Sequence, residues 1–224
     1  VFPKDRISFT YEPKYDGLSI SLIYTDGVLT DAVTRGNQIE GESVYENVKT
    51  IRNVPLRLNP VSRGDDLFSV VELPHYFEVR GEVLMPQGAF DRLNAEKAAN
   101  GEKPFANKRN AASGSLKQLD PKVTARRGLL VNVYAAYSTD EDFQREHMQS
   151  QEETLALLSD LGFSMYCPAD RQASYADVAA LTEAINRFNE IRTSHQLPYD
   201  CDGVVVKVNE RRHQEFLGLN TTFP

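Results

Sequence analysis

The feature that most restricts the fold is an alternation of apolar and polar residues that begins at Leu18. In the run LSISLIY, apolar side chains alternate with serines, as in a strand that buries one face. The residues TDG and the run VLTDAVT follow directly, and an Asp-Gly pair between two such runs is typical of a tight hairpin. The sequence therefore predicts an antiparallel pair of strands near its N-terminus.

Strand and helix patterns are mixed irregularly along the rest of the chain. Strand patterns occur at residues 76–85, 129–137, 163–167 and 202–209. Helical patterns occur at residues 44–51, 86–100, 149–162 and 174–191. Ser174 and Asp177 form a capping pair at the start of the last helix. This order predicts an α+β fold rather than a doubly wound parallel sheet.

Composition excludes several classes of protein. The chain has 224 residues, 41% hydrophobic and 25% charged, which is ordinary for a globular domain with a sizeable core. It has no run near the roughly 18 apolar residues of a membrane span, and no signal peptide, so we expect a cytoplasmic protein without membrane contact. Cys167, Cys201 and the four histidines lack metal-binding spacing, so we predict no metal cage in the protein.

Positive charge is concentrated in one part of an acidic chain. The net charge is −7, but residues 101–128, here called the basic segment, hold seven Lys or Arg against two Asp or Glu, a local +5 that leaves −12 elsewhere. Small Ser, Gly, Asn and Ala residues separate these cations, which suits contact with a phosphate backbone. A solvated loop is the alternative interpretation.

The stretch EPKYDG, just before the predicted hairpin, is a candidate reactive site. In an extended backbone Lys14 and Asp16 share a face, and Gly17 lets another group approach the main chain closely. A lysine nucleophile must lose its proton, which a nearby cation favours and an adjacent carboxylate opposes. If Lys14 is a nucleophile, a second positive charge is therefore expected near it. The alternative is a surface ion pair.

Two further charges have candidate roles. Lys207 lies in the apolar strand DGVVVKV, where a buried ammonium needs a partner, and it is the candidate for the second positive charge. Its alternative is an edge-strand lysine that extends to water. Glu82, on the charged face of FEVRGEV, can accept hydrogen bonds from ribose hydroxyls, or can form a cross-strand ion pair.

The order of these motifs closely resembles the adenylation domain of the NAD-dependent bacterial DNA ligases. The motifs are KYDG, TRG, EVRGE, FANKRNAASGSLKQLDP and LPYDCDGVVVKV. Long strings such as ENVKTIRNVPLRL and DPKVTARRGL extend the resemblance from about Ile7 to the C-terminus. It implies that residues 1–224 are an adenylation domain. The implied fold is a nucleotidyltransferase core of two subdomains with mainly antiparallel sheets and flanking helices, with the nucleotide between the subdomains.

The resemblance also implies roles for the residues around the nucleotide. Lys14 matches the lysine that attacks the α-phosphate of NAD, which forms lysyl-AMP and releases nicotinamide mononucleotide. Asp16 is expected to stabilise the developing charge or to interact with the ribose and Mg²⁺. Glu12 matches a residue that contacts adenine, and Arg35 and Glu82 match groups around the sugar and phosphate.

Four more residues are implied to contact the nucleotide or DNA. Gly17 belongs to the nucleotide site, and Lys207 matches a phosphate-contacting lysine. Arg109 and Lys117 fall where the family has arginines for nicked DNA and phosphate. The AMP then moves to the 5′-phosphate of a nick in duplex DNA, where the 3′-hydroxyl displaces it. We expect a monomeric, nucleoid-associated enzyme, with Mg²⁺ carried largely by the nucleotide phosphates.

Two alternatives remain at this point. One is an ATP- or GTP-using RNA ligase or capping enzyme, which shares the lysine motif and the DGVVVK-like strand. The other is a non-catalytic adenylate-binding core, because Lys117 and Ser194 stand where the family has arginines, with Arg192 as a possible substitute. In the family, a nicotinamide-recognition module would precede Val1 and a last lysine motif would follow Pro224. We therefore expect the chain alone to be impaired in full ligation.

Overall fold

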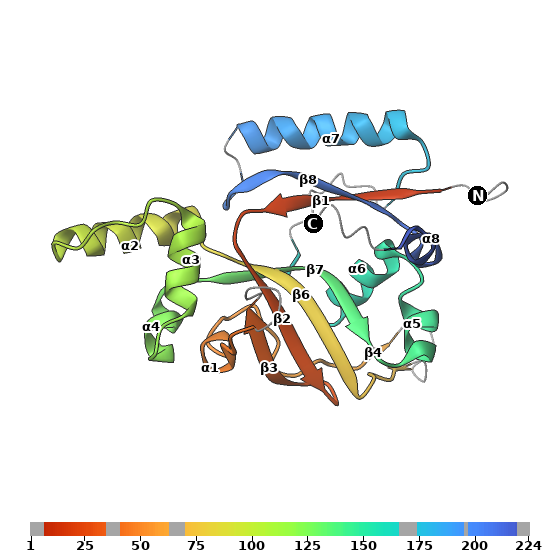
Figure 1. Cartoon of the computed structure of the whole chain (residues 1–224), viewed down its shortest axis with the longest axis horizontal. Coiled ribbons are helices and arrows are strands. Elements are labelled where there is room, and N and C mark those ends of the chain that lie inside the picture. Colours follow the sequence, from red (N-terminus) through yellow and green to blue (C-terminus); the bar gives the residue numbers. More distant parts are fainter. Residues whose placement is uncertain (1–6, 35–40, 63–69, 166–173, 195–196, 219–224) are drawn as a thin grey trace.

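A computed structural model describes residues 7–34, 41–62, 70–165, 174–194 and 197–218 of the chain (Figure 1). The strands in this part are β1 (Phe9–Tyr15), β2 (Leu18–Thr25), β3 (Val28–Thr34), β4 (Val61–Ser62), β5 (Val70–Val71), β6 (Tyr76–Leu84), β7 (Leu130–Ser138) and β8 (Cys201–Val208). The helices are α1 (Tyr45–Val48), α2 (Gln87–Ala99), α3 (Lys108–Leu116), α4 (Pro121–Arg126), α5 (Glu141–His147), α6 (Gln151–Asp160), α7 (Val178–Thr193) and α8 (Arg211–Leu217).

The larger unit is a four-stranded antiparallel sheet in the order β3-β2-β6-β7. Alternation along β2 and β6 places Leu22 opposite Val79, both fully buried, on the apolar face. Helices α1, α3 and α6 pack beside β3, β6 and β7 respectively. The resulting core continues to Leu157 and Leu158 of α6. The opposite face of the sheet carries the polar residues of the alternation.

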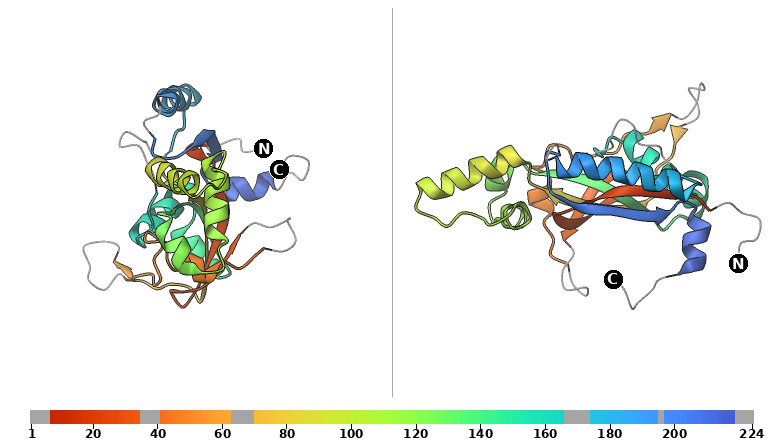
Figure 2. Two further views of the ribbon diagram at one scale, coloured as in Figure 1. Left: turned by 90° about the vertical axis from the view of Figure 1, so that its left-hand side faces the viewer. Right: turned by 90° about the horizontal axis from the view of Figure 1, so that it is seen from above.

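A second, smaller unit lies along the first. Strands β1 and β8 form an antiparallel pair, and the long helix α7 covers one side of that pair (Figures 1 and 2). Its apolar cluster includes Tyr11 of β1 and Phe188 of α7, whose ring centroids are 6.0 Å apart. The structure thus confirms an α+β fold with antiparallel sheets and flanking helices.

The predicted hairpin is confirmed with its turn. Strands β2 and β3 are joined by Asp26 and Gly27, whose φ angles of 50° and 72° are both positive. Two consecutive positive φ angles match the type I′ turn that an Asp-Gly pair favours, because its twist matches the twist of the strands.

Two sequence predictions near α7 and α6 require correction. Asp177, not Ser174, caps α7, and its side chain accepts a hydrogen bond from the amide of Ala179. The helix cannot start at Ser174 because Tyr175 forms two backbone hydrogen bonds with Phe9 in an extended conformation. The predicted strand at 163–167 is also wrong for residues 163–165, which form no strand, while the other two lie outside the described residues.

Strand β8 differs from the strand expected to be buried on both sides. Val205 and Val206 are 38% and 46% exposed. The physical reason is that, within the described residues, β8 pairs only with β1. A sheet of two strands leaves the outer edge of each strand unpaired, and α7 covers only one face. No helix in the described part of the chain has both the length and the apolar character needed to cross a membrane.

Hydrogen bonds to Glu210 close the far end of the smaller unit. Its carboxylate accepts from the Ser8 hydroxyl at 2.6 Å and from the Ser8 amide at 3.3 Å. Burial acts to raise the pKa of Glu210, but hydrogen bonds from Ser8, from the Glu210 amide and from His213 together outweigh burial and hold that pKa below its ordinary value.

We predict that Glu210→Gln lowers the free energy of unfolding by about 1–2 kcal/mol near neutral pH. Because the folded-state pKa is lowered, the stabilisation is present above the unfolded pKa and is lost as pH falls through the folded value. The difference from wild type should therefore shrink below about pH 4. Denaturant unfolding across this pH range measures it. Glu183→Gln, which alters an exposed pair with Arg187, should cost under ~0.5 kcal/mol. A pH-independent cost for Glu210→Gln would contradict the prediction.

Candidate active site

Strands β1 and β8 present a row of polar side chains on the face directed towards the central sheet. Glu12 lies opposite Val205, and Lys14 lies opposite Gly203. Residues two apart on a strand project to the same side, so Glu12 and Lys14 are on one face. The face away from them carries Tyr11 and packs against α7. The helix therefore orients the polar row.

One end of this row is an ion pair whose carboxylate is buried. The side chain of Glu12 is 5% exposed, and its Oε2 atom lies 2.8 Å from Nζ of Lys207. Its Oε1 atom accepts a hydrogen bond of 2.7 Å from Nε2 of Gln151 on α6. Lys207 and Gln151 also donate to the backbone oxygen of Tyr134, at 3.1 and 2.8 Å. We call Glu12, Tyr134, Gln151 and Lys207 the Glu12 cluster. Both carboxylate oxygens of this buried charge are satisfied.

A β-bulge places Tyr134 in the Glu12 cluster. Arg80 of β6 pairs with Ala135 and Gly81 pairs with Val133, so Tyr134 is the extra residue of β7. A bulge redirects the side chain of the extra residue. The Tyr134 ring centroid lies 5.5 Å from Nζ of Lys207, and its hydroxyl lies 3.1 Å from Ser19 Oγ. Sequence reasoning missed Tyr134 and Gln151, because neither a bulge nor a contact 139 residues away has a signal in the local pattern.

The other end of the row is an exposed lysine. Nζ of Lys14 lies 3.6 Å from Oδ2 of Asp202, and the two side chains are 59% and 54% exposed. Asp202 is itself the extra residue of a bulge, because Lys14 pairs with Gly203 and Tyr15 pairs with Cys201. An exposed pair of this length holds a side chain only weakly. The Lys14 amine is therefore accessible to a reactant. The sequence signal for Asp202 was the run DCDG.

The two lysines of the row are separated. Lys207 lies opposite Thr10, four residues along β1 from Lys14, which is roughly 13 Å of strand. Lys207 pairs with Glu12 and Lys14 pairs with Asp202. The structure thus places the expected second positive charge beside Glu12 rather than beside the candidate nucleophile. Sequence reasoning recognised that a lysine in β8 needs a partner, but the partner comes from the neighbouring strand.

The link between β1 and β2 is held tightly. Oδ1 of Asp16 lies 3.2 Å from Nη1 of Arg109, at the start of α3. A Cβ atom added to Gly17 would lie 2.3 Å from the backbone oxygen of Val83 and 2.8 Å from Cγ of Glu82. Gly17 is therefore needed because the chain passes against β6 at this point. The close approach brings the turn after Lys14 next to Glu82.

Three sequence-predicted residues lie apart from this row or outside the described residues. Lys117 is the residue that directly follows α3, and its Nζ lies 2.6 Å from Oε2 of Glu42. Arg35 falls outside the described residues. The proposed substitute Arg192 donates to the backbone oxygen of Cys201 at 3.4 Å, near the start of β8, so that role stays a prediction.

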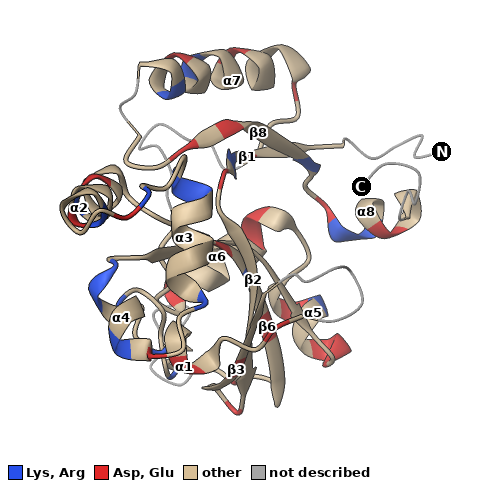
Figure 3. Ribbon diagram, turned by 60° about the vertical axis from the view of Figure 1, so that its left-hand side comes forward, with Lys and Arg blue, Asp and Glu red and all other residues tan. Residues whose placement is uncertain are grey.

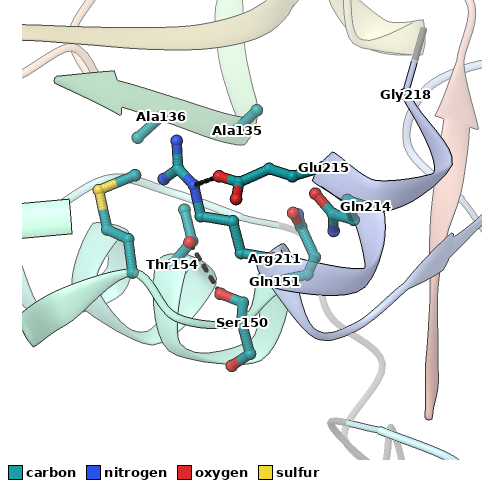
Figure 4. Close-up of a pocket in the computed structure, with 10 residues that line it drawn as sticks. Ala135, Ala136, Ser150, Gln151, Thr154, Arg211, Gln214, Glu215 and Gly218 are labelled. Atoms are coloured by element: carbon teal, nitrogen blue, oxygen red, sulfur yellow. Dashed lines mark hydrogen bonds and ion pairs between the residues drawn. The ribbon is translucent and has the colours of Figure 1, made fainter. Parts of the chain in front are cut away.

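Two further features of the molecule are a group of basic residues and a pocket. Figure 3 shows Lys and Arg residues on α4 and at the start of α3. A pocket of about 440 Å³ lies between β7, α6 and α8, and it shares Gln151 with the Glu12 cluster. Arg211 and Glu215, one turn apart on α8, form an ion pair on the α8 side of this pocket (Figure 4). No group of three or more metal-ligating side chains occurs within the described ranges.

Comparison with known proteins gives one consistent result. Residues 1–224 match the family described as the NAD-dependent DNA ligase adenylation domain. The chain is 42% identical to a DNA ligase of Neisseria gonorrhoeae, over 96% of this chain and 24% of that protein. It is 46% identical to a DNA ligase of Porphyromonas gingivalis, over 95% of this chain and 29% of that protein. It is 41% identical to a DNA ligase of Acinetobacter baylyi, over 99% of this chain and 30% of that protein. The chain thus spans under a third of the length of these relatives.

We predict that Gly17→Ala lowers the free energy of unfolding by about 1–3 kcal/mol, since the new methyl group must displace the β6 backbone. Thermal or denaturant unfolding measures this. Gly88→Ala is the matched control, because its nearest neighbour would be Arg92 Nη1 at 3.6 Å in α2. That control should be neutral or stabilising by up to ~1 kcal/mol. Equal effects of the two substitutions would refute the close-approach interpretation.

Proposed function

The chain belongs to the NAD-dependent DNA ligase adenylation domain family, and we propose that it transfers AMP from NAD to Lys14, the first step in sealing nicked duplex DNA. The observation that carries this proposal is the polar row on β1. An accessible amine on Lys14 stands two residues from a buried acceptor on Glu12, about 7 Å along one strand. A nucleophile and a recognition group on one strand are held at a constant spacing.

The nucleotide is proposed to lie between the β1–β8 pair and the central sheet, as in a two-subdomain nucleotidyltransferase. Adenine would contact Glu12, with the aromatic ring of Tyr134 at the same end of the row. Glu82 borders the turn after Lys14 and would meet the ribose. Lys207 is proposed to contact the phosphates. Its Nζ donates hydrogen bonds to Glu12 and to the Tyr134 carbonyl, so Lys207 must give up one of these partners to contact a phosphate.

The reaction is a displacement at the α-phosphorus of NAD. The Lys14 ammonium first loses one proton to solvent. The neutral Nζ then forms the new P–N bond as the P–O bond to nicotinamide mononucleotide breaks, and Nζ releases a second proton to solvent. Asp202, 3.6 Å from that amine, orients it before attack. Asp16, held by Arg109, is the carboxylate proposed to face the ribose or a phosphate-bound Mg²⁺. Magnesium bound to the phosphates would neutralise their charge.

The later steps are proposed to involve DNA and more of a longer protein. AMP would pass to the 5′-phosphate of a nick, and the 3′-hydroxyl would then displace it. Lys122 and Arg126 of α4 are exposed within the basic segment and suit contact with phosphates. The relatives are more than three times as long as the matched region. We therefore propose that residues 1–224 are the adenylation unit and that full ligation needs further segments.

The test is the intact mass of the protein after incubation with NAD or ATP, each with Mg²⁺. We expect a gain of one AMP with NAD only, lost when a chelator removes Mg²⁺. Lys14→Ala and Lys14→Arg should both abolish the gain, since Arg keeps the charge but is not a nucleophile at this pH. Lys49→Ala, which alters a pair with Glu46 on α1, is the matched control and should gain AMP normally.

Each other outcome has a definite meaning. A gain with ATP alone would identify an ATP-using relative. A gain that persists in Lys14→Ala would place the nucleophile elsewhere. If neither the chain nor a longer protein that contains it gains AMP, the site is a non-catalytic binding core.

A further inference from the structure

A buried lysine lies near the nucleophile and has no role in the chemistry described above. The side chain of Lys108 is 10% exposed, and its Nζ lies 2.6 Å from Oδ1 of Asp200. The two residues are 92 positions apart in the sequence. Taking an ammonium group out of water is costly even when it is paired. Its presence therefore calls for a specific explanation.

Stability of α3 does not supply that explanation. Lys108 and Arg109 are the first two residues of the helix, where unsatisfied amides carry partial positive charge and cations are unfavourable. Asn107 already caps the helix, because its side chain accepts a hydrogen bond from the amide of Asn110. The two cations at this end make their contacts outside α3 instead.

The Lys108–Asp200 pair joins the two apolar clusters of the structure. Helix α3 is anchored in the larger cluster by Ala111, Ala112 and Leu116, all fully buried. Asp200 directly follows Tyr199, which is buried in the smaller cluster. The pair therefore connects an anchored helix to the segment that leads into β8.

Asp200 also contacts the segment that carries Lys14. Its backbone oxygen accepts a hydrogen bond of 3.1 Å from the amide of Asp16. Two residues further on, Asp202 pairs with Lys14 itself. Arg109, next to Lys108, contacts the side chain of the same Asp16. The start of α3 thus holds Asp16 twice: through its amide by way of Asp200, and through its carboxylate directly.

We propose that Lys108 is a positioning residue for adenylyl transfer, which acts through Asp200 to hold Asp16 and so to align Lys14 for attack. This inference rests on the proposed function, and it adds a residue that does not touch the nucleotide. Misalignment of a nucleophile slows the chemical step more than it weakens binding of the substrate. The role therefore predicts a specific kinetic signature.

The kinetic test measures single-turnover formation of lysyl-AMP against NAD concentration, in the chain or the longer protein that gains AMP. Lys108→Met should lower the rate constant at saturating NAD by about tenfold or more, with the half-saturating concentration changed less than about threefold. Asp200→Asn should act in the same direction, and the double variant should be no slower than the slower single variant. Lys97→Met is the matched control, since Lys97 pairs with Glu102 at the far end of α2, and its rate should equal wild type.

The structural test does not depend on activity. Hydrogen exchange at the Asp16 amide should accelerate by about tenfold or more in Lys108→Met, and should not change in Lys97→Met. If the wild type gains no AMP, the proposed function fails, but this exchange rate still decides whether Lys108 holds Asp16. Unchanged exchange would overturn the inference. So would a Lys108→Met protein that is thermally less stable yet has a wild-type rate constant at saturating NAD.

Discussion

The ion pair between the buried Glu12 and Lys207 is the contact on which the arrangement of the site depends. Both residues belong to the smaller unit, but Lys207 also donates to the Tyr134 carbonyl of the central sheet, and Glu12 accepts from Gln151 of α6. A buried carboxylate is tolerated only with its hydrogen bonds made. That requirement links β1, β7, β8 and α6 at one point, and so determines which face of β1 meets the central sheet.

Departures from regular pairing position the other residues of the site. Tyr134 and Asp202 are each the extra residue of a bulge, and each side chain projects towards the polar row rather than following the alternation of its strand. Gly17 and Gly81 lie close to these bulges in the sequence or in the sheet. Neither position has room for a side chain, because an added Cβ at either would lie 2.6 Å or less from a backbone oxygen. The regular part of β1 sets the spacing between Glu12 and Lys14, and the bulges in β7 and β8 bring Tyr134 and Asp202 close to them.

The two ends of the row differ in burial, and the difference suits different tasks. The Glu12 end is enclosed and fully hydrogen-bonded, which favours selective recognition of one ligand group. The Lys14 end is exposed, with a weak ion pair, which leaves the amine open to a phosphorus atom. The start of α3 lies on the side of Lys14 rather than of Glu12, as the contact between Arg109 and Asp16 shows. Cations of the basic segment pair with acidic residues from other parts of the chain, as Lys108 does with Asp200 and Lys117 with Glu42.

The sequence by itself determined the α+β class, the β2–β3 hairpin, the bounds of α2 to within one residue, and the motif that contains Lys14, because alternation, turn residues and helix-terminal residues act over a few positions. Only the tertiary structure decided the partner of Lys207, the roles of Gln151 and Tyr134, and the link from Lys108 to Asp16. Those contacts join residues 73 to 195 positions apart, or run through bulges and main-chain atoms. Local patterns carry no information about which distant strand supplies a partner, because that pairing depends on how the whole chain packs to bury its apolar residues.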